Sequence, residues 1–434
     1  MIKLPKFKAR KNKKAVCRLV GRKDYTMNKT TLKKYANLIA RCGVNVQKGQ
    51  EVVVNAGLDQ PEFVKMVVEE CYKAGAKHVS VEWSYQPLTK LNVRYCTEKV
   101  LSTMEKWQIE KLEHRAEVLP CMIHLISEDP DGLAGINQKK MAKSMAARAK
   151  IIKPIRTKME NKYQWCIAAV PGKEWAKKVF PGEKVSVAVE KLWEAILSTS
   201  RVNDDPIEAW RQHNADLASR CKFMNALGIK ELKYKSASGT DFRVGLLPNA
   251  IFMAGGEETL GSNIYYNPNI PSEELFTSPR KGDADGIVYS SRPLSYGGQL
   301  IDKFWLKFEG GKVVDLGAEK NEELLRELIG MDEGAAYLGE CALVPYNSPI
   351  RESGLLFYNT LFDENAACHL ALGRGFTNVI KGYENYTEAE LHAMGINDSF
   401  VHEDFMIGTE DMSIVAVCGD GREVKIFDNG NWAF

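Results

Sequence analysis

The chain has 434 residues, a length typical of two domains, and 44% of its residues are hydrophobic, which is ample for buried cores. No apolar run approaches the ~18 residues of a membrane-spanning helix, and the start lacks the apolar core of a secretory signal, so we expect a cytoplasmic protein with no membrane partner. Ten scattered cysteines form no CxxC pair, and a chain of this size needs no disulfide framework, so we expect them to be reduced.

The net charge of +3 is unevenly distributed along the chain. Ten of the 59 basic residues lie within residues 1–23, which hold no acidic residue, so the remaining chain carries 49 basic residues against 56 acidic ones. We expect residues 1–26 to form a basic, disordered tail. A basic run also attracts phosphate groups without sequence specificity, so nucleic-acid contact is the alternative for the tail, although we do not expect nucleic acid as a partner.

Residues 27–228 alternate between helical and strand patterns. Helical spacing of apolar residues covers residues 32–43, 61–76, 88–119, 139–161, 187–201 and 205–228, with breaks expected within 88–119 and at Pro154. Runs typical of strands cover residues 50–57, 78–84, 120–130 and 163–171. This alternation predicts an α/β N-terminal domain with a mostly parallel sheet.

The pattern becomes β-rich beyond Gly228. Turn signals such as Gly-Thr, Gly-Gly and Asn-Pro separate short strand-like runs, and one helix is expected over residues 321–339. The end of the chain is typical of a hairpin that turns at residues 419–421. We therefore expect a second, α+β and β-rich domain over residues 229–434.

This C-terminal domain contains residues with the chemistry of metal ligands, namely Glu274, Glu340, His369, His402 and Asp404. Imidazole and carboxylate groups are the usual ligands of catalytic divalent transition metals. His402 and Asp404 are two residues apart, so on a strand both side chains point to the same face. Five ligands exceed the needs of one tetrahedral site, which suggests two metal ions that share a bridging carboxylate.

The other histidines are His78, His114, His124, His213 and His392. None of them has a histidine or carboxylate partner at ligand spacing in a motif of this kind. We expect each of them to be structural.

Four motifs surround the candidate ligands: PSEELFT at residues 271–277, LGECALVP at 338–345, TLFDENAACHLALG at 360–373 and HEDFMIG at 402–408. On these motifs, and over nearly the whole chain, the sequence resembles the M29 family of metallo-aminopeptidases, the aminopeptidase T and S class. The resemblance implies that the five candidate ligands hold two divalent metal ions, zinc or cobalt, with Glu340 as the bridge. It also implies peptide substrates and a homodimer.

The acidic neighbour of Glu274 is Glu273, and only one of the two can face the site. Adjacent side chains on extended backbone point to opposite faces. The resemblance favours Glu274, the second glutamate of PSEELFT, as the metal ligand.

The resemblance also identifies a departure near the site. Well-known family members carry a tyrosine seven residues after the histidine that matches His369, and this chain has Phe376 there. The missing hydroxyl is a candidate donor to the developing oxyanion, and loss of such a donor typically costs ~10²–10³ in rate. Arg374 could supply a positive charge instead, and Tyr358, Tyr383 and Tyr386 are other candidate replacements.

Glu364 lies in the DEN sequence shortly before His369. It could act as the general base or as the anchor of the substrate's amino group. The alternative is that it supports His369 or caps the turn before it, because such partners orient ligating histidines.

Together these residues predict a metal-dependent aminopeptidase that removes N-terminal amino acids from peptides through a metal-bridged hydroxide, with Glu340, Glu364 and Arg374 as catalytic residues. The ligands alone indicate a metal-assisted hydrolase, and the resemblance supplies the peptide substrate. Two alternatives stay open. One is a dinuclear hydrolase of esters or phosphoesters, and the other is a non-enzymatic homologue that binds through its basic tail.

Overall fold

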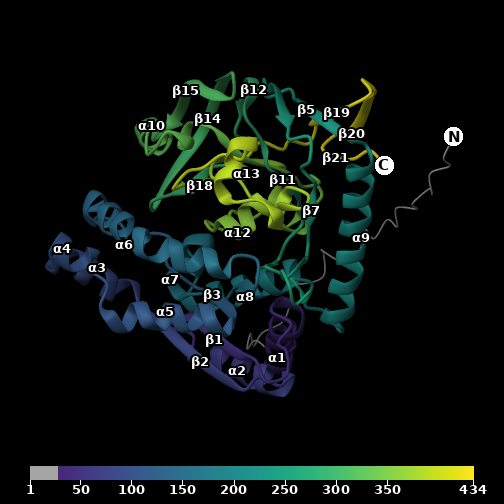
Figure 1. Ribbon diagram of the computed structural model, residues 1–434. Helices are drawn as coiled ribbons and strands as arrows, with labels where there is room; N and C mark the ends of the chain where they lie inside the picture. The colour runs from purple at the N-terminus through teal and green to yellow at the C-terminus, as the bar shows by residue number, and fades with distance from the viewer. Residues whose placement is uncertain (1–27) are drawn as a thin grey trace.

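The structure, a computed structural model, describes residues 28–434, so the predicted tail at residues 1–26 lies outside the described residues. Figure 1 shows two layers, with the first part of the chain below and most of the second part above. Helix α9 (Pro206–Ala226) runs along one side of both layers.

A parallel sheet organises the lower layer. Its strands lie in the order β10-β4-β3-β1-β2, and every neighbouring pair is parallel. They are β1 (Glu51–Gly57), β2 (His78–Ser84), β3 (Cys121–Ile126), β4 (Trp165–Ala169) and β10 (Asn269–Ile270). The four predicted strands and their parallel arrangement are confirmed, whereas the fifth strand comes from beyond Gly228.

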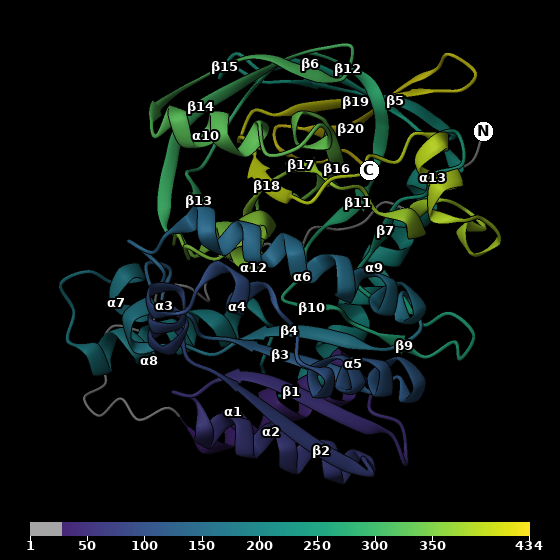
Figure 2. The same cartoon turned by 60° about the vertical axis from the view of Figure 1, so that its left-hand side comes forward.

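Helices cover both faces of this sheet (Figure 2). Besides α9 they are α1 (Lys29–Leu38), α2 (Pro61–Ala74), α3 (Gln86–Tyr95), α4 (Glu98–Ser102), α5 (Lys106–Val118), α6 (Gln138–Met159), α7 (Lys173–Val179) and α8 (Val185–Thr199). The predicted helix over residues 88–119 is divided, because Thr97 and Glu105 form new N-caps for α4 and α5. Helix α7 was not predicted.

The break expected at Pro154 is wrong, because α6 continues through that residue to Met159. Pro154 is on the exposed side of the helix, whereas Ile155 and Met159 lie one turn apart and are buried. Burial of these two side chains stabilises the last turns and outweighs the backbone hydrogen bond that a proline removes.

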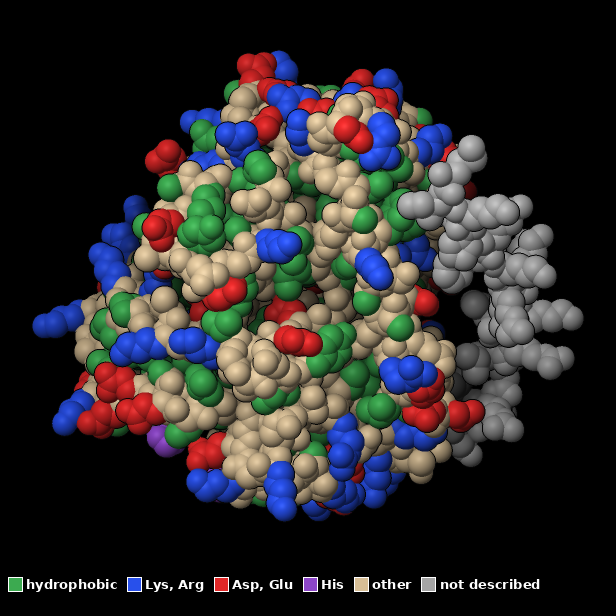
Figure 3. All heavy atoms as spheres, turned by 45° about the vertical axis from the view of Figure 1, so that its right-hand side comes forward, with side chains coloured by type: hydrophobic (Ala, Val, Ile, Leu, Met, Phe, Trp, Pro, Cys, Tyr) green, Lys and Arg blue, Asp and Glu red, His purple; other side chains and the backbone are tan. Residues whose placement is uncertain are grey.

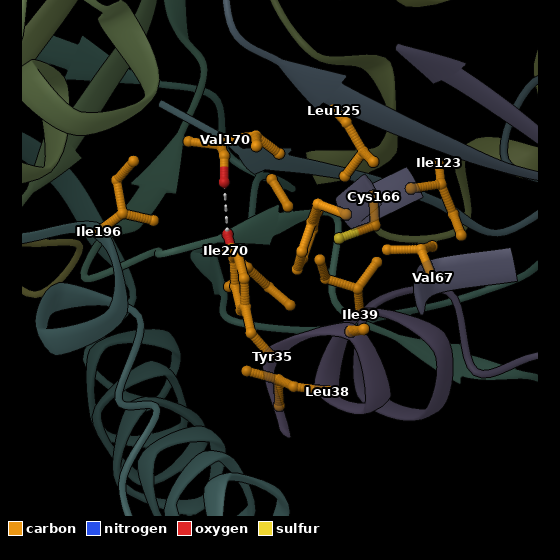
Figure 4. Packing of buried hydrophobic residues seen from close by; sticks show 14 of the residues in the cluster. Tyr35, Leu38, Ile39, Val67, Ile123, Leu125, Cys166, Val170, Ile196 and Ile270 are labelled. Atoms are coloured by element: carbon orange, nitrogen blue, oxygen red, sulfur yellow. Dashed lines mark hydrogen bonds between the residues drawn. The ribbon is translucent and has the colours of Figure 1, made fainter. Parts of the chain in front are cut away.

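Side chains from α1, α2, α8 and the parallel sheet form the lower core (Figure 4). Tyr35 of α1 is fully buried, and its hydroxyl donates a hydrogen bond to the carbonyl of Ala169 at 3.2 Å. Phe357 and Phe362, from the second part of the chain, also belong to this core. The chain therefore crosses between the two layers more than once, and the division into domains at Gly228 stays a prediction.

Two antiparallel sheets form the upper layer. The larger one has the order β13-β14-β12-β6-β5-β19-β20-β21, with β15 beside β14. Its strands are β5 (Ile229–Lys235), β6 (Asp241–Leu246), β12 (Pro279–Tyr289), β13 (Leu294–Tyr296), β14 (Gln299–Glu309), β15 (Lys312–Lys320), β19 (Ser413–Cys418), β20 (Glu423–Asp428) and β21 (Asn431–Trp432). The β19–β20 hairpin closes with a hydrogen bond from the Gly421 N–H to the Cys418 carbonyl, as predicted.

The smaller sheet has the order β18-β17-β16-β11-β7. Its strands are β7 (Met253–Ala254), β11 (Leu275–Thr277), β16 (Leu338–Leu343), β17 (His369–Gly373) and β18 (His402–Met406). Shorter elements complete the layer: β8 (Glu257–Glu258), β9 (Tyr265–Tyr266), α10 (Glu322–Ile329), α11 (Pro349–Glu352), α12 (Thr360–Asp363) and α13 (Glu388–Met394). The predicted helix over residues 321–339 is too long, because α10 ends at Ile329 and the last residues enter β16.

The two antiparallel sheets enclose the upper core, which contains Leu275, Leu343, Leu370 and Phe405 from one face of the smaller sheet. Among the described residues, all nine cysteines are unpaired and no helix is long and apolar enough to cross a membrane.

Candidate metal centre

The five predicted ligands come together on the smaller sheet of the upper layer. They form two groups, Glu274–Glu340–His369 and Glu340–His402–Asp404, and within each group the candidate ligand atoms all lie within 4.8 Å of one another. Glu340 belongs to both groups. Figure 3 shows acidic side chains at a hollow between the two layers of the molecule.

Strand geometry explains why these side chains meet. In β18, His402 and Asp404 are two residues apart and share a face, as predicted. Asp404 lies opposite Ala371 of β17, and Ala371 lies opposite Glu340 of β16, so all three point to the same side of the sheet. The face that carries the ligands is opposite to the one that packs into the upper core.

A β-bulge places Glu340. The register between β16 and β17 shifts between Leu338 and Glu340, so Gly339 is an extra residue in the strand. A Cβ atom on Gly339 would lie 2.1 Å from the carbonyl oxygen of Arg374. Only glycine permits this close approach, which brings the end of β17 against the ligand-bearing strand.

Glu274 and Glu273 point in different directions, as the sequence predicts. The Oε2 atom of Glu274 lies 3.1 Å from Nε2 of His369. Glu273 instead forms a bidentate ion pair with Arg201, whose Nη2 atom lies 2.7 Å from Oε2 of Glu273. Glu274 is thus the member of the pair that faces the candidate metal centre.

Both histidines are oriented by backbone carbonyls. The Nδ1 atom of His369 lies 3.2 Å from the Ala367 carbonyl oxygen, and Nδ1 of His402 lies 2.7 Å from that of Arg374. Carbonyl oxygens only accept, so each Nδ1 carries the proton and each Nε2 is left to face the carboxylates. Metal-ligating histidines are held in this way.

Acidic groups crowd the site and shift the pKa values of its members. Burial and the charges of Asp404 and Glu274 raise the pKa of Glu340 to about 7, although His402 opposes the shift. Burial disfavours a charged ring at His369, but the neighbouring Glu274 carboxylate raises its pKa to about 9. Without a cation the cluster therefore retains protons that a divalent metal ion would displace.

The residues fit a divalent transition metal. Imidazole Nε2 atoms and carboxylate oxygens are its usual donors, and both types converge here from buried or half-buried side chains. The Oδ1 atom of Asp404 is buried and has no hydrogen-bond partner within residues 28–434. A metal ion would satisfy this oxygen and balance the carboxylates.

Glu364 is buried at the start of the 3₁₀ turn after α12. Burial and the charges of Asp404 and Glu274 raise its pKa well above the usual range. Asn365 Nδ2 lies 3.3 Å from its Oε1 atom. Glu364 is therefore beside the ligands without being a member of either group.

Arg374 and Phe376 both lie beside His402, and Arg374 contacts it through its backbone. The Arg374 guanidinium lies 3.3 Å from Glu160 and is exposed, so its carbonyl rather than its charge contacts His402. The Phe376 ring lies 5.0 Å from the His402 ring and 5.2 Å from the Phe276 ring. The position that matches the family's tyrosine is thus next to a candidate ligand.

Sequence reasoning missed Arg201 and Asn365, and it gave His213 only a general structural role. All three bind the Ser272–Glu273 segment next to Glu274. Arg201 is 72 positions from Glu273 in the sequence, and no local pattern signals such a distant pair.

A parallel α/β layer beneath a β-rich layer with a His/carboxylate cluster defines a candidate metalloenzyme. The family described as thermophilic metalloprotease (M29) matches residues 28–432. The chain belongs to this family. Its membership confirms the resemblance stated from the motifs.

Named relatives cover nearly the whole chain. Aminopeptidase AmpS of Bacillus subtilis is 42% identical over 405 residues, which are 93% of this chain and 98% of the relative. Aminopeptidase T of Thermus thermophilus is 37% identical over 406 residues, with the same coverage. The solved structure of wild-type AmpT from Thermus thermophilus superimposes with a TM-score of 0.86 at 36% identity, and the match covers 94% of this chain and 100% of that one.

Proposed function

We propose that this protein is a metal-dependent aminopeptidase that removes N-terminal amino acids from peptides. The observation that carries the proposal is the pair of ligand groups that share Glu340. Membership of a metalloprotease family and similarity to named aminopeptidases support the choice of substrate.

Two divalent ions, zinc or cobalt, suit the site better than one. Glu340 would bridge them, Glu274 and His369 would hold one, and His402 and Asp404 would hold the other. Their combined charge would balance the four clustered carboxylates of Glu274, Glu340, Glu364 and Asp404. When bound, such ions lower the pKa of a shared water to give the bridging hydroxide and polarise the scissile carbonyl.

Glu364 is the best candidate for proton transfer. Its carboxyl group is buried beside the ligands, and burial with the neighbouring carboxylates raises its pKa, which favours acceptance of a proton. In this proposal a Glu364 oxygen takes the proton of the attacking water and delivers it to the leaving amide nitrogen. The free amino group of the peptide would be held among the remaining carboxylate oxygens.

Arg374 acts in this proposal through its carbonyl, which fixes the Nδ1–H of His402. A direct role for its guanidinium in oxyanion stabilisation would require it to leave Glu160. Phe376 offers no hydroxyl, so the metal centre would stabilise the oxyanion.

A homodimer is part of the same proposal, because the family resemblance implies one. The lower layer exposes several large apolar side chains between residues 83 and 107: Trp83, Tyr85, Leu88, Leu91, Tyr95, Val100 and Trp107. Exposed apolar side chains that gather in one patch are typical of protein interfaces, so this part of the lower layer is the candidate dimer surface. Light scattering coupled to gel filtration should give twice the chain mass of 48.7 kDa, and the monomer mass would contradict the proposal.

The test of substrate class is hydrolysis of amino-acid p-nitroanilides and dipeptides by the metal-loaded protein. We expect release of N-terminal residues from free peptides and none from N-acetylated ones, because an exopeptidase must bind the free amino group. Turnover of p-nitrophenyl phosphate or simple esters without peptide hydrolysis would favour the alternative dinuclear hydrolase. Metal binding without hydrolysis of either substrate type would favour the non-enzymatic alternative.

A further inference from the structure

Glu274 differs from the other candidate ligands in how its backbone is held. The other four are members of strands β16, β17 and β18 and are fixed by the hydrogen bonds of the sheet. Glu274 immediately precedes β11, whose first paired residue is Leu275. Its position therefore depends on contacts made by the residues just before it.

The contact made by Glu273 is the strongest of these. The side chains of Glu273 and Arg201 form a bidentate ion pair. The Glu273 side chain is 6% exposed and that of Arg201 is 20% exposed. Arg201 comes from the connection between α8 and α9, far from Glu273 in sequence. The planar guanidinium presents its donors in a rigid fork, so this geometry fixes the direction of the carboxylate as well as its charge.

Two further contacts hold the same segment. The Oδ1 atom of Asn365 accepts a hydrogen bond from the Glu273 N–H at 2.6 Å. The Nε2 atom of His213 lies 2.7 Å from the Ser272 carbonyl oxygen. The segment before Glu274 is thus held from the α8–α9 connection, from α9 and from the turn before His369.

The backbone at Arg201 is also specifically held. Its φ of 58° is in the left-handed region, which is uncommon for residues other than glycine. The Trp210 indole N–H donates to the Ser200 carbonyl at 2.8 Å, and the Arg201 N–H donates to that of Ser198 at 3.1 Å. The fold maintains an unfavourable backbone conformation at the residue that pairs with Glu273.

We propose that Arg201 is a positioning residue for the metal centre. Adjacent side chains of an extended segment point to opposite sides. By holding Glu273 on one side, Arg201 turns the Glu274 carboxylate to the other side, where it completes the group with Glu340 and His369. This proposal rests on one part of the proposed function, namely that this cluster binds metal ions.

The geometry limits the effect to one ion. Glu274 belongs only to the Glu274–Glu340–His369 group, and among the described residues Arg201 forms its side-chain hydrogen bonds and ion pair with Glu273, not with the Glu340–His402–Asp404 group. Loss of the bidentate ion pair between Arg201 and Glu273 should therefore weaken one of the two metal-binding events. Partners of this kind typically contribute a factor of roughly 10 to 100 in metal affinity.

The test compares the full chain with Arg201→Gln, Arg201→Lys and the control Arg211→Gln. Arg211 pairs with Glu208 on the exposed surface of α9, and these contacts do not involve the Ser272–Glu273 segment. EDTA first removes the metal from each protein, and circular dichroism checks its fold. Co²⁺ is then titrated in while the heat of binding and the visible spectrum of the bound ion are recorded. Neither readout requires peptide hydrolysis.

In Arg201→Gln we expect one binding event to weaken by roughly 10- to 100-fold, with a changed cobalt spectrum, while the other event is unchanged. Arg201→Lys should give a smaller loss, because it keeps the charge without the fork, and Arg211→Gln should match the wild type. A folded Arg201→Gln protein with wild-type affinity in both events overturns the proposal. If that variant does not fold, wild-type affinity in Arg201→Lys overturns it instead.

The outcome is separable from the proposed function. A wild-type protein that binds cobalt but hydrolyses no peptide contradicts the aminopeptidase and leaves the role of Arg201 standing. Normal peptide hydrolysis with unchanged metal affinity in Arg201→Gln contradicts only the role of Arg201.

Discussion

The Nε2 atom of His402 lies 3.1 Å from the Oε2 atom of Glu340. Glu340 is also a member of the group that contains Glu274 and His369. One carboxylate therefore connects two sets of ligand atoms, and this connection is the basis of the proposed dinuclear centre.

Replacement of Glu340 with Gln should abolish activity and weaken both metal-binding events, because the amide cannot supply the shared negative charge. A metal centre contributes several kcal/mol of charge stabilisation, so we expect kcat/KM to fall by at least about 10³-fold. Activity assays and metal titration of the variant check this, with circular dichroism to show that the fold is kept. Near-normal turnover in Glu340→Gln would rule out the bridging assignment.

Replacement of Gly339 with Ala should damage both stability and metal binding. The new Cβ atom would lie 2.1 Å from the Arg374 carbonyl oxygen, which holds His402, so the backbone must shift. Overpacking of this kind costs about 1–3 kcal/mol in the free energy of unfolding. Urea unfolding and metal titration measure the two effects.

Gly419→Ala is the matched control, because its Cβ would have no neighbour closer than 3.5 Å. Equal losses of stability and metal affinity in the two alanine variants would contradict the explanation for Gly339.

Replacement of Phe376 with Tyr should raise kcat if the hydroxyl can reach the developing oxyanion. The Phe376 ring already lies 5.0 Å from the His402 ring, so the added group enters the neighbourhood of the ligands. Restoring one oxyanion donor corresponds to as much as ~10²-fold in kcat, with little change in KM. An unchanged or lower kcat would show that the metal centre needs no hydroxyl at this position.

Because of His124, we expect the free energy of unfolding to depend on pH in a way that does not involve the metal site. Burial, with help from Arg156 and Arg115, lowers the pKa of this histidine in the folded protein. In the unfolded chain this histidine has its ordinary pKa of about 6.5, so the unfolded state binds the proton at a higher pH than the folded state does. The contribution of neutral His124 to the free energy of unfolding is therefore fully present above about pH 6.5. It is lost as the pH falls from about 6.5 towards the pKa of the folded state.

Urea unfolding of the metal-free protein between about pH 5 and pH 8 measures this loss. His124→Gln should reduce it, whereas His78→Gln, at an exposed position on β2, should leave it unchanged. An acid loss of equal size in His124→Gln and the wild type would contradict the role of His124.

Local patterns of apolar residues predicted the parallel strands, whereas the family motifs that contain the five candidate ligands predicted their grouping. The two-residue spacing of His402 and Asp404 correctly placed them on one face. Alternation along extended backbone predicted that only one of Glu273 and Glu274 faces the site, and the family resemblance selected Glu274. The structure shows the two glutamates with different partners.

Features that depend on packing or on distant contacts could not be predicted in this way. Pro154 predicts a break in α6, but burial of Ile155 and Met159 stabilises the last turns of the helix. The pairing of Arg201 with Glu273 depends on how α8 and α9 pack. The contact of Arg374 through its carbonyl depends on the bulge at Gly339, which appears only when the strands are paired.

The central claim is that two divalent ions at the Glu340 cluster are needed for N-terminal hydrolysis. The most direct test is to strip the protein with EDTA, add Zn²⁺ or Co²⁺ in known equivalents, and follow hydrolysis of leucine p-nitroanilide. We expect no activity without metal and full activity at two ions per chain. Full activity in the metal-free protein, or saturation at one ion per chain, would contradict the central claim.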